Sequence, residues 1–286
     1  MNTPPLVRVS ELGNLPEQFA FETMVAATAS TALPAITSGA LLLNLQRGRT
    51  SRLDRMPEDY GFFLPQALTG LILSSSVDGE PLTHLINAST RVSLGYYAGR
   101  LAAADCEQLQ ELLVANELAG KVPPLRRHDS ISDKATEPVH SQASAQRMVS
   151  KFAPDERLLV VPIFGGGYVP GIQTTLLYQR ERPNADVAVY PIYYSIQKAL
   201  HTAPLLTEAQ ISYLRAITAD RTIVLHDEDG SNRVDGTMSM AVAFFRRALN
   251  HPRVYGIVNL DNRDETIRAA TGEWWENCHQ AGLLPE

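Results

Sequence analysis

Three consecutive acids stand out in the C-terminal half of the chain. A β-branched run from Thr222 ends in Asp227, Glu228 and Asp229, and after a small polar loop an Ala-rich apolar pattern follows from Met240. This order predicts a buried strand, an acidic strand end, a loop and the start of a helix. Carboxylates placed there accept hydrogen bonds from sugar hydroxyls or hold a hydrated Mg²⁺. The loop and the helix N-terminus suit a phosphate group.

A second loop that suits an anion lies about sixty residues earlier. The strand-like run 157–164 leads into a glycine-rich segment, 165–171, and then into a helical pattern over 172–180. Consecutive glycines let the backbone approach an anionic group closely. A plain tight turn is the alternative, although Gly165, Gly166 and Gly167 are more glycines than most turns need. Neither loop carries a Walker A motif or the glycine spacing of a dinucleotide fold.

Strand and helix patterns alternate after residue 146, which predicts the fold class. Strands are expected near 157–164, 186–194, 222–227 and 253–260, with helices between them and over 146–152. Repeating units of this kind imply an α/β protein with a mainly parallel sheet flanked by helices. Ligands in such folds bind at the carboxyl ends of the strands. Because both special loops follow such ends, we predict that they lie side by side at one edge of the sheet.

The chain divides into parts of different composition. We predict a helical N-terminal region over 1–120, a polar linker or mobile loop over 121–145, the core over 146–264 and a helical tail over 265–286. The segment from Met24 to Leu45 has no charge, but it is rich in Ala, Thr and Ser and contains Pro34 and Gly39. We therefore predict a buried helix pair there and no membrane span.

Composition narrows the function classes. The 286 residues carry a formal charge of −6 and no basic run with interleaved aromatic residues, which argues against a nucleic-acid surface. Cys106 and Cys278 are far apart and lack CxxC spacing, so two reduced thiols in the cytoplasm are expected. No basic segment followed by a leucine-rich core begins the chain, and no signal peptide is predicted.

The two loops together resemble those of type I phosphoribosyltransferases. In that family one strand ends in a glycine-rich pyrophosphate loop, and a later strand ends in paired acids followed by a 5'-phosphate loop. The matching parts are 160–171 and 223–237, and the resemblance covers roughly residues 146–262. It implies that the protein uses 5-phosphoribosyl diphosphate and Mg²⁺ to ribosylate a nitrogenous small-molecule acceptor, with release of pyrophosphate. Dimers are common in proteins of this kind, so a homodimer is compatible with the resemblance.

The resemblance also implies roles for individual residues. Asp227, Glu228 and Asp229 would be the catalytic acids and the metal ligands. Lys198, in the segment after the middle strand, is a candidate for binding pyrophosphate together with the backbone N–H groups of the three glycines, although a surface lysine is the alternative. The 5'-phosphate loop would consist of Ser231, Asn232, Arg233, Val234, Asp235, Gly236 and Thr237.

The 5'-phosphate loop departs from the family pattern in two ways. It is longer by about two residues if Asp227 is the first acid, whereas Gly230 replaces the second acid if Asp229 is the first. In addition, Asp235 stands where the family often has glycine. A carboxylate beside a phosphate repels it unless it points away or meets Mg²⁺. This departure favours a second hypothesis, a non-catalytic module that binds a nucleotide or sugar phosphate. A third is a structural or membrane-associated protein that works through its Ala-rich N-terminal region.

His226 and Asp227 together spell the His-Asp pair of metal phosphohydrolases. Those enzymes carry the pair on helices together with further histidines, whereas His226 ends a predicted strand. We therefore expect a hydrogen-bonded structural histidine and not a metal ligand.

Two substitutions in the 5'-phosphate loop test the predicted effects of Gly236 and Asp235 on phosphate binding separately. Gly236→Val should weaken ribose 5-phosphate binding by about 2–3 kcal/mol, because a side chain there blocks backbone amides from the phosphate. Asp235→Asn should leave the affinity equal or increase it, because a repelling charge is removed. Calorimetric titration of both variants measures the two effects. A large loss of affinity in Asp235→Asn would show that our placement of the phosphate is wrong.

Overall fold

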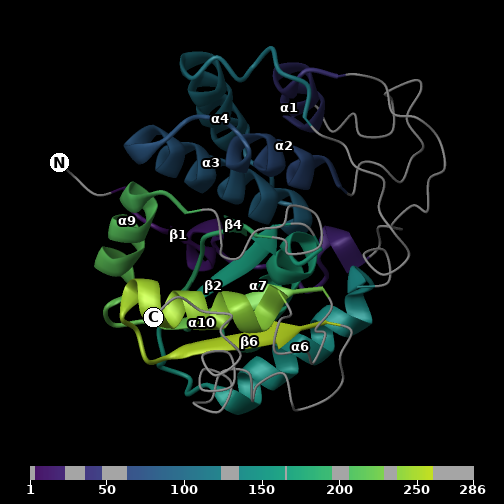
Figure 1. Ribbon diagram of the computed structural model, residues 1–286. Coiled ribbons are helices and arrows are strands. Elements are labelled where there is room, and N and C mark those ends of the chain that lie inside the picture. The colour runs from purple at the N-terminus through teal and green to yellow at the C-terminus, as the bar shows by residue number, and fades with distance from the viewer. Residues whose placement is uncertain are drawn as a thin grey trace.

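A six-stranded, mostly parallel sheet lies at the centre of the computed structural model (Figure 1). The structure describes residues 4–22, 36–46, 63–123, 135–164, 166–194, 206–228 and 237–259. The strands are β1 (Val7–Arg8), β2 (Leu158–Phe164), β3 (Val187–Val189), β4 (Ile192–Tyr193), β5 (Thr222–Asp227) and β6 (Val254–Val258). Their order is β1-β3-β2-β5-β6, with β4 paired to the end of β2. Only β1 is antiparallel to its neighbour, β3, so the predicted mainly parallel α/β class is confirmed.

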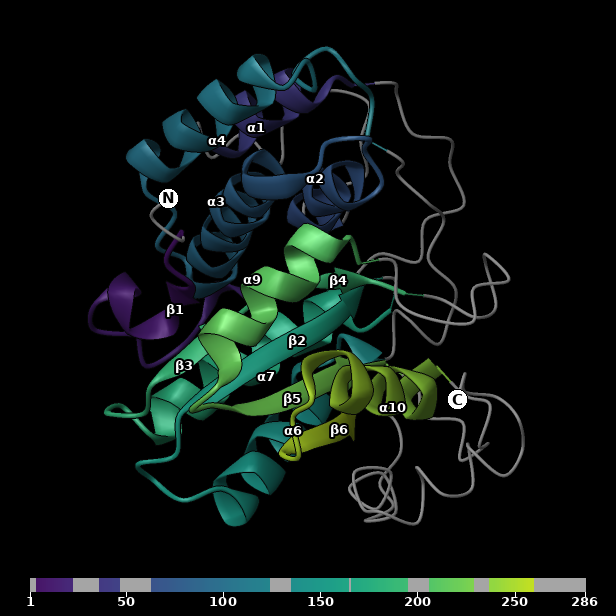
Figure 2. The ribbon, with the colours of Figure 1, turned by 60° about the vertical axis from the view of Figure 1, so that its left-hand side comes forward.

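Helices cover both faces of the sheet (Figure 2). On one face lie α6 (Pro138–Lys151) and α7 (Tyr168–Glu181), and on the other lie α9 (Glu208–Thr218) and α10 (Thr237–Leu249). This double cover explains why β2 and β5 are buried along nearly their whole length. The helices approach the sheet closely on both faces. A Cβ atom on Gly171 of α7 would lie 2.9 Å from Cβ of Pro162 in β2. A Cβ atom on Gly256 of β6 would lie 2.6 Å from Sδ of Met238 in α10.

The N-terminal part is helical and packs beside the β1, β3 and β4 side of the sheet (Figures 1 and 2). Its helices are α1 (Ser38–Gln46), α2 (Leu64–Leu73), α3 (Gly79–Ala98) and α4 (Ala103–Ala115), preceded by the 3₁₀ turns η1 (Val9–Leu12) and η2 (Ala20–Glu22). In this packing α3 contacts α7 and α9, and α2 contacts β4. One continuous cluster of buried apolar side chains includes residues of both this region and the sheet.

Two predicted elements differ from the structure near the sheet. The strand expected over 186–194 is split into β3 and β4, because Pro191 cannot donate a backbone hydrogen bond. The N-terminal region, expected to be mostly helical, also supplies β1, whose two residues are too few to show a strand period.

Two helices begin earlier than the sequence suggested. The segment 138–145, assigned to the linker, forms the first half of α6, and its Ser141 and Ser144 are fully buried. The polar pattern of this segment was misleading because these hydroxyls make hydrogen bonds inside the protein. Similarly, 168–171 belongs to α7 and not to the glycine-rich loop, and Pro170 is tolerated there because it lies in the first turn.

Among the described residues, no helix is long and apolar enough to cross a membrane. The second half of the uncharged segment contains α1, which is nine residues long. Residues 24–35 of that segment, like 124–134 of the linker and the tail 265–286, lie outside the described residues.

Candidate functional site

The two predicted loops follow neighbouring strands at the point where the chain changes direction across the sheet. From β2 the chain crosses to β3 on one side, and from β5 it crosses to β6 on the other side. The register shows that these crossovers use opposite faces, because Gly171 of α7 packs on Pro162 and His226, whereas Met238 of α10 packs on Gly256, the partner of Leu225. Ligands of open α/β sheets bind at such a switch between strand ends.

The glycine loop after β2 rests directly on the end of β5. A Cβ atom on Gly167 would lie 2.6 Å from Cα of Asp227 and 3.0 Å from the carbonyl oxygen of Ile163. These neighbours are backbone atoms that cannot move aside, so this position requires glycine. At Gly166 the space for a Cβ atom is filled by the carboxyl group of Glu228. The predicted contact between the two loops is confirmed for the residues described on each side.

Asp227 ends β5 and is buried, with 7 % of its surface exposed. Its Oδ1 atom accepts a hydrogen bond of 2.8 Å from the backbone N–H of Glu228. In β5, His226 faces α7, so Asp227 faces the side of α10. Acids at a strand end are usually exposed to solvent, whereas Asp227 is buried at the end of β5.

Each loop leads into a helix whose N-terminus lies at the same edge of the sheet. Gly167 immediately precedes α7, and α10 begins at Thr237, where the sequence predicted the end of the phosphate loop. The edge between β2 and β5 therefore combines two helix N-termini with two carboxylates. The predicted site residues Gly165, Lys198, Asp229, Ser231, Asn232, Arg233, Val234, Asp235 and Gly236 lie outside the described residues.

The N-terminal helices hold the start of α7 in place. The hydroxyl group of Tyr168 is shared between Thr69 of α2, at 2.8 Å, and Ser93 of α3, at 2.6 Å. Burial raises the pKa of Tyr168 to about 12, so the phenol stays protonated at neutral pH. Phe164, at the end of β2, lies against Gly70 of α2, where a Cβ atom would collide with its ring. The helical region thus fixes both ends of the short glycine loop.

A buried network of polar side chains supports the site from the α7 face. His226 shares a hydrogen bond of 3.1 Å between its Nε2 atom and Oγ1 of Thr174 in α7. Burial, and then the charge of Arg147, lower the pKa of His226 to about 3. The imidazole is therefore neutral near pH 7, and the expectation of a hydrogen-bonded histidine is confirmed.

Asn259, which follows β6, is the second centre of this network. Its side chain bonds to Ser144, to Ser141 and to the carbonyl oxygen of Ala135. Sequence reasoning missed this residue because the pattern of 253–260 predicts one continuous strand. A polar residue at the end of an apolar run was the available signal.

The described residues contain no group of three or more His, Cys, Asp or Glu side chains placed to hold a metal ion. Asp227 and Glu228 are the two candidate ligands that the structure describes. Mg²⁺ needs only one or two protein carboxylates, with water and substrate phosphates completing its six oxygen ligands. The donor set at the strand end therefore fits this ion.

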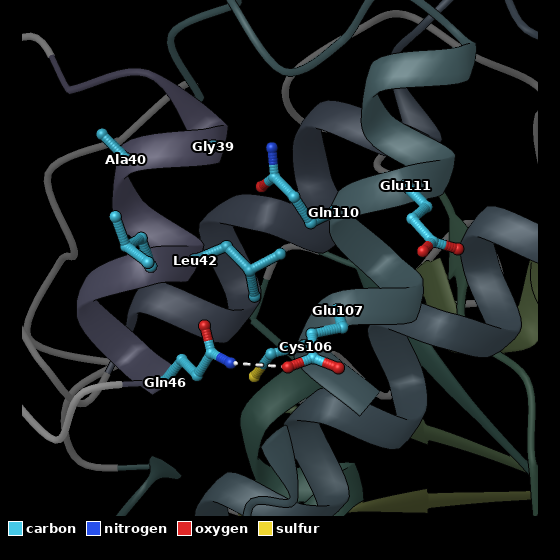
Figure 3. Close-up of a pocket in the computed structure, with 9 residues that line it drawn as sticks. Gly39, Ala40, Leu42, Gln46, Cys106, Glu107, Gln110 and Glu111 are labelled. Atoms are coloured by element: carbon cyan, nitrogen blue, oxygen red, sulfur yellow. Dashed lines mark hydrogen bonds between the residues drawn. The ribbon is translucent and has the colours of Figure 1, made fainter. Parts of the chain in front are cut away.

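A cavity of about 490 Å³ lies elsewhere, between α1 and α4 (Figure 3). None of the predicted site residues that the structure describes lines it. It is lined by Gly39, Ala40, Leu42, Leu43, Gln46, Cys106, Glu107, Gln110 and Glu111. Burial raises the pKa of the Cys106 thiol to about 11, so the thiol stays protonated at neutral pH and is a poor nucleophile.

Comparisons of the chain with models of protein families, with curated proteins and with solved structures give no match.

The burial of His226 predicts how stability depends on pH. Because its folded pKa of about 3 lies below the ordinary value of 6.5, unfolding takes up a proton below about pH 6.5. The contribution of this group is complete above that pH and falls by up to about 1.4 kcal/mol per unit as the pH drops toward 3. His226→Gln should therefore show a shallower loss of unfolding free energy than the wild type between pH 6 and 4.

Urea unfolding at several pH values measures this difference. His84→Gln, a change at a half-exposed histidine of α3, is the control and should keep the wild-type slope. An equal slope in His226→Gln and the wild type would contradict the burial of a neutral imidazole.

Proposed function

We propose that the protein is a phosphoribosyltransferase that binds 5-phosphoribosyl diphosphate with Mg²⁺ at the carboxyl ends of β2 and β5. The observation that supports this most directly is the contact of Gly167 with Asp227. This contact brings the glycine loop next to the acidic end of β5, and each of the two segments leads into the N-terminus of a helix. A sugar carrying phosphates at both ends needs two sites for anions with polar groups between them, and this edge has that composition.

The described residues can each take a defined part in such binding. Backbone N–H groups of Gly166, Gly167 and the first turn of α7 would bind the pyrophosphate group. Thr237 and the first turn of α10 would bind the 5'-phosphate. Asp227 and Glu228 would hold the ribose hydroxyls and Mg²⁺. The Asp227 carboxylate is already oriented by the hydrogen bond that it accepts from the backbone N–H of Glu228.

The chemistry asks the protein mainly for positioning. As pyrophosphate leaves, C1' of the ribose becomes oxocarbenium-like, and a nitrogen atom of the acceptor attacks it. Holding the two reactants together and binding the leaving group through fixed N–H groups lowers the barrier. When bound, Mg²⁺ would neutralise charge that develops on the pyrophosphate.

A non-catalytic binding module is the second candidate, and one observation favours it. The Glu228 carboxyl group fills the space beside Gly166, so a negative charge stands on the glycine loop. A diphosphate would have to displace this group or share Mg²⁺ with it. Together with Asp235, this arrangement fits a protein that senses a sugar phosphate without transferring it.

Release of pyrophosphate distinguishes the two candidates. The protein is mixed with 5-phosphoribosyl diphosphate, Mg²⁺ and a panel of nitrogenous bases, and free pyrophosphate is measured by a coupled assay. A transferase releases pyrophosphate only with its acceptor, whereas a binding module shows affinity for the sugar diphosphate without release.

The acids generate a direct prediction. Asp227→Asn combined with Glu228→Gln should abolish binding of 5-phosphoribosyl diphosphate, because the ligands of the ribose hydroxyls and Mg²⁺ are lost. The amides keep the size of the carboxyl groups, so the folded structure should survive, as circular dichroism would show. Calorimetric titration in the presence of Mg²⁺ gives the affinity.

A matched control removes the same two charges elsewhere. Glu107→Gln with Glu111→Gln on the exposed side of α4 changes the net charge equally and should keep wild-type affinity. Unchanged affinity in the Asp227 and Glu228 double variant would remove these acids from the site.

A further inference from the structure

Asn259 connects the end of β5, which carries the candidate acids, to helix α6. Its backbone N–H donates a hydrogen bond of 3.2 Å to the carbonyl oxygen of Asp227. This bond lies one residue beyond the last paired position of the two strands, Asp227 with Val258. It therefore holds the end of β5 at the point where the chain leaves the sheet.

The side chain of Asn259 is fully buried and fixed in three directions. Its Oδ1 atom accepts a hydrogen bond of 2.7 Å from Ser144, and its Nδ2 atom donates to the carbonyl oxygen of Ala135, at 2.8 Å, and to Ser141, at 3.0 Å. Two of these partners belong to α6 and the third precedes it. Three of the four hydrogen-bonding positions of the amide are thus used by one helix and the segment before it.

The partners of Asn259 are themselves held in place. Ser141 donates a hydrogen bond of 2.7 Å to Gln173 of α7, and Gln173 donates one of 3.1 Å to the carbonyl oxygen of Thr136. All of these side chains are buried, where hydrogen bonds are strong and an unpaired group is costly. The position of Asn259 is consequently determined by two helices.

We propose that Asn259 is a positioning residue of the candidate site, which sets the place of the Asp227 carboxylate by joining the ends of β5 and β6 to α6. It acts through the backbone of Asp227 and does not touch a ligand. Its effect on ligand binding rests on the proposed function, whereas its effect on the strand end does not.

A comparable buried asparagine, which donates hydrogen bonds to residues outside the candidate site, provides the control. Asn87 of α3 donates hydrogen bonds to the carbonyl oxygen of Pro5, at 2.9 Å, and to the hydroxyl group of Tyr213, at 3.4 Å. Asn87→Ala therefore removes a buried amide with a similar number of bonds. A purely structural role for Asn259 predicts that the two alanine variants lose stability and nothing else.

The test compares Asn259→Ala, Ser144→Ala and Asn87→Ala in the full chain. NMR chemical shifts of the Glu228 amide and the Asp227 carbonyl report the strand end, and calorimetry with ribose 5-phosphate reports the site. Asn259→Ala should move both shifts and weaken binding about tenfold or more, the size found for residues that orient ligands. Ser144→Ala, which removes one bond and keeps the asparagine, should move the shifts in the same direction by less.

The outcomes distinguish the positioning role of Asn259 from the proposed function of the site. Asn87→Ala should leave the shifts and the affinity as in the wild type. The proposal is overturned if Asn259→Ala and Ser144→Ala leave the Asp227 and Glu228 signals unchanged. If the wild type does not bind ribose 5-phosphate, the proposed function fails, and the chemical shifts still decide the role of Asn259.

Discussion

The close approach of the Gly167 backbone to the end of β5 is the contact on which the candidate site depends. It exists because β2 and β5 are parallel neighbours and their outgoing connections turn to opposite faces. The loop after β2 must then pass over the end of β5 before α7 begins. A side chain at this position would meet backbone atoms, so the sequence needs glycine. The same contact brings backbone N–H groups and carboxylates to one place.

Supporting this contact requires buried polar groups on several sides. Tyr168 is held by hydroxyl groups of α2 and α3, and His226 by Thr174 of α7. Burying a polar side chain of this kind lowers the stability of the fold unless hydrogen bonds inside the protein replace those to water. The helical N-terminal part and α7 supply these partners. They are therefore part of the structure that positions the strand ends, although most of their residues carry no chemistry.

Much of the fold could be predicted from patterns that follow directly from burial. The apolar runs of β2 and β5, the parallel arrangement and the start of α10 at Thr237 were all visible in the sequence, because covered strands are apolar and helices begin after polar loops. The contact between the two loops followed from the rule that parallel strands end at one edge. The chemical roles of all the predicted site residues stay predictions, and Gly165, Lys198, Asp229 and residues 231–236 also lie outside the described residues.

Other features were hidden because they depend on distant contacts. The two residues of β1 form a strand only through pairing with β3. The first half of α6 has the composition of a linker, and only the structure shows that Ser141 and Ser144 face Gln173 and Asn259. The burial of Asp227 was equally hidden, since acids are rarely buried unless they are paired.

A crystal soaked with 5-phosphoribosyl diphosphate and Mg²⁺ would reveal whether the sugar diphosphate binds where β2 and β5 end. We expect diphosphate density within hydrogen-bonding distance of the Gly166 and Gly167 backbone amides, with Mg²⁺ beside Asp227 or Glu228. Density for the sugar diphosphate at another place, such as the cavity between α1 and α4, or none at a saturating concentration, would contradict this expectation.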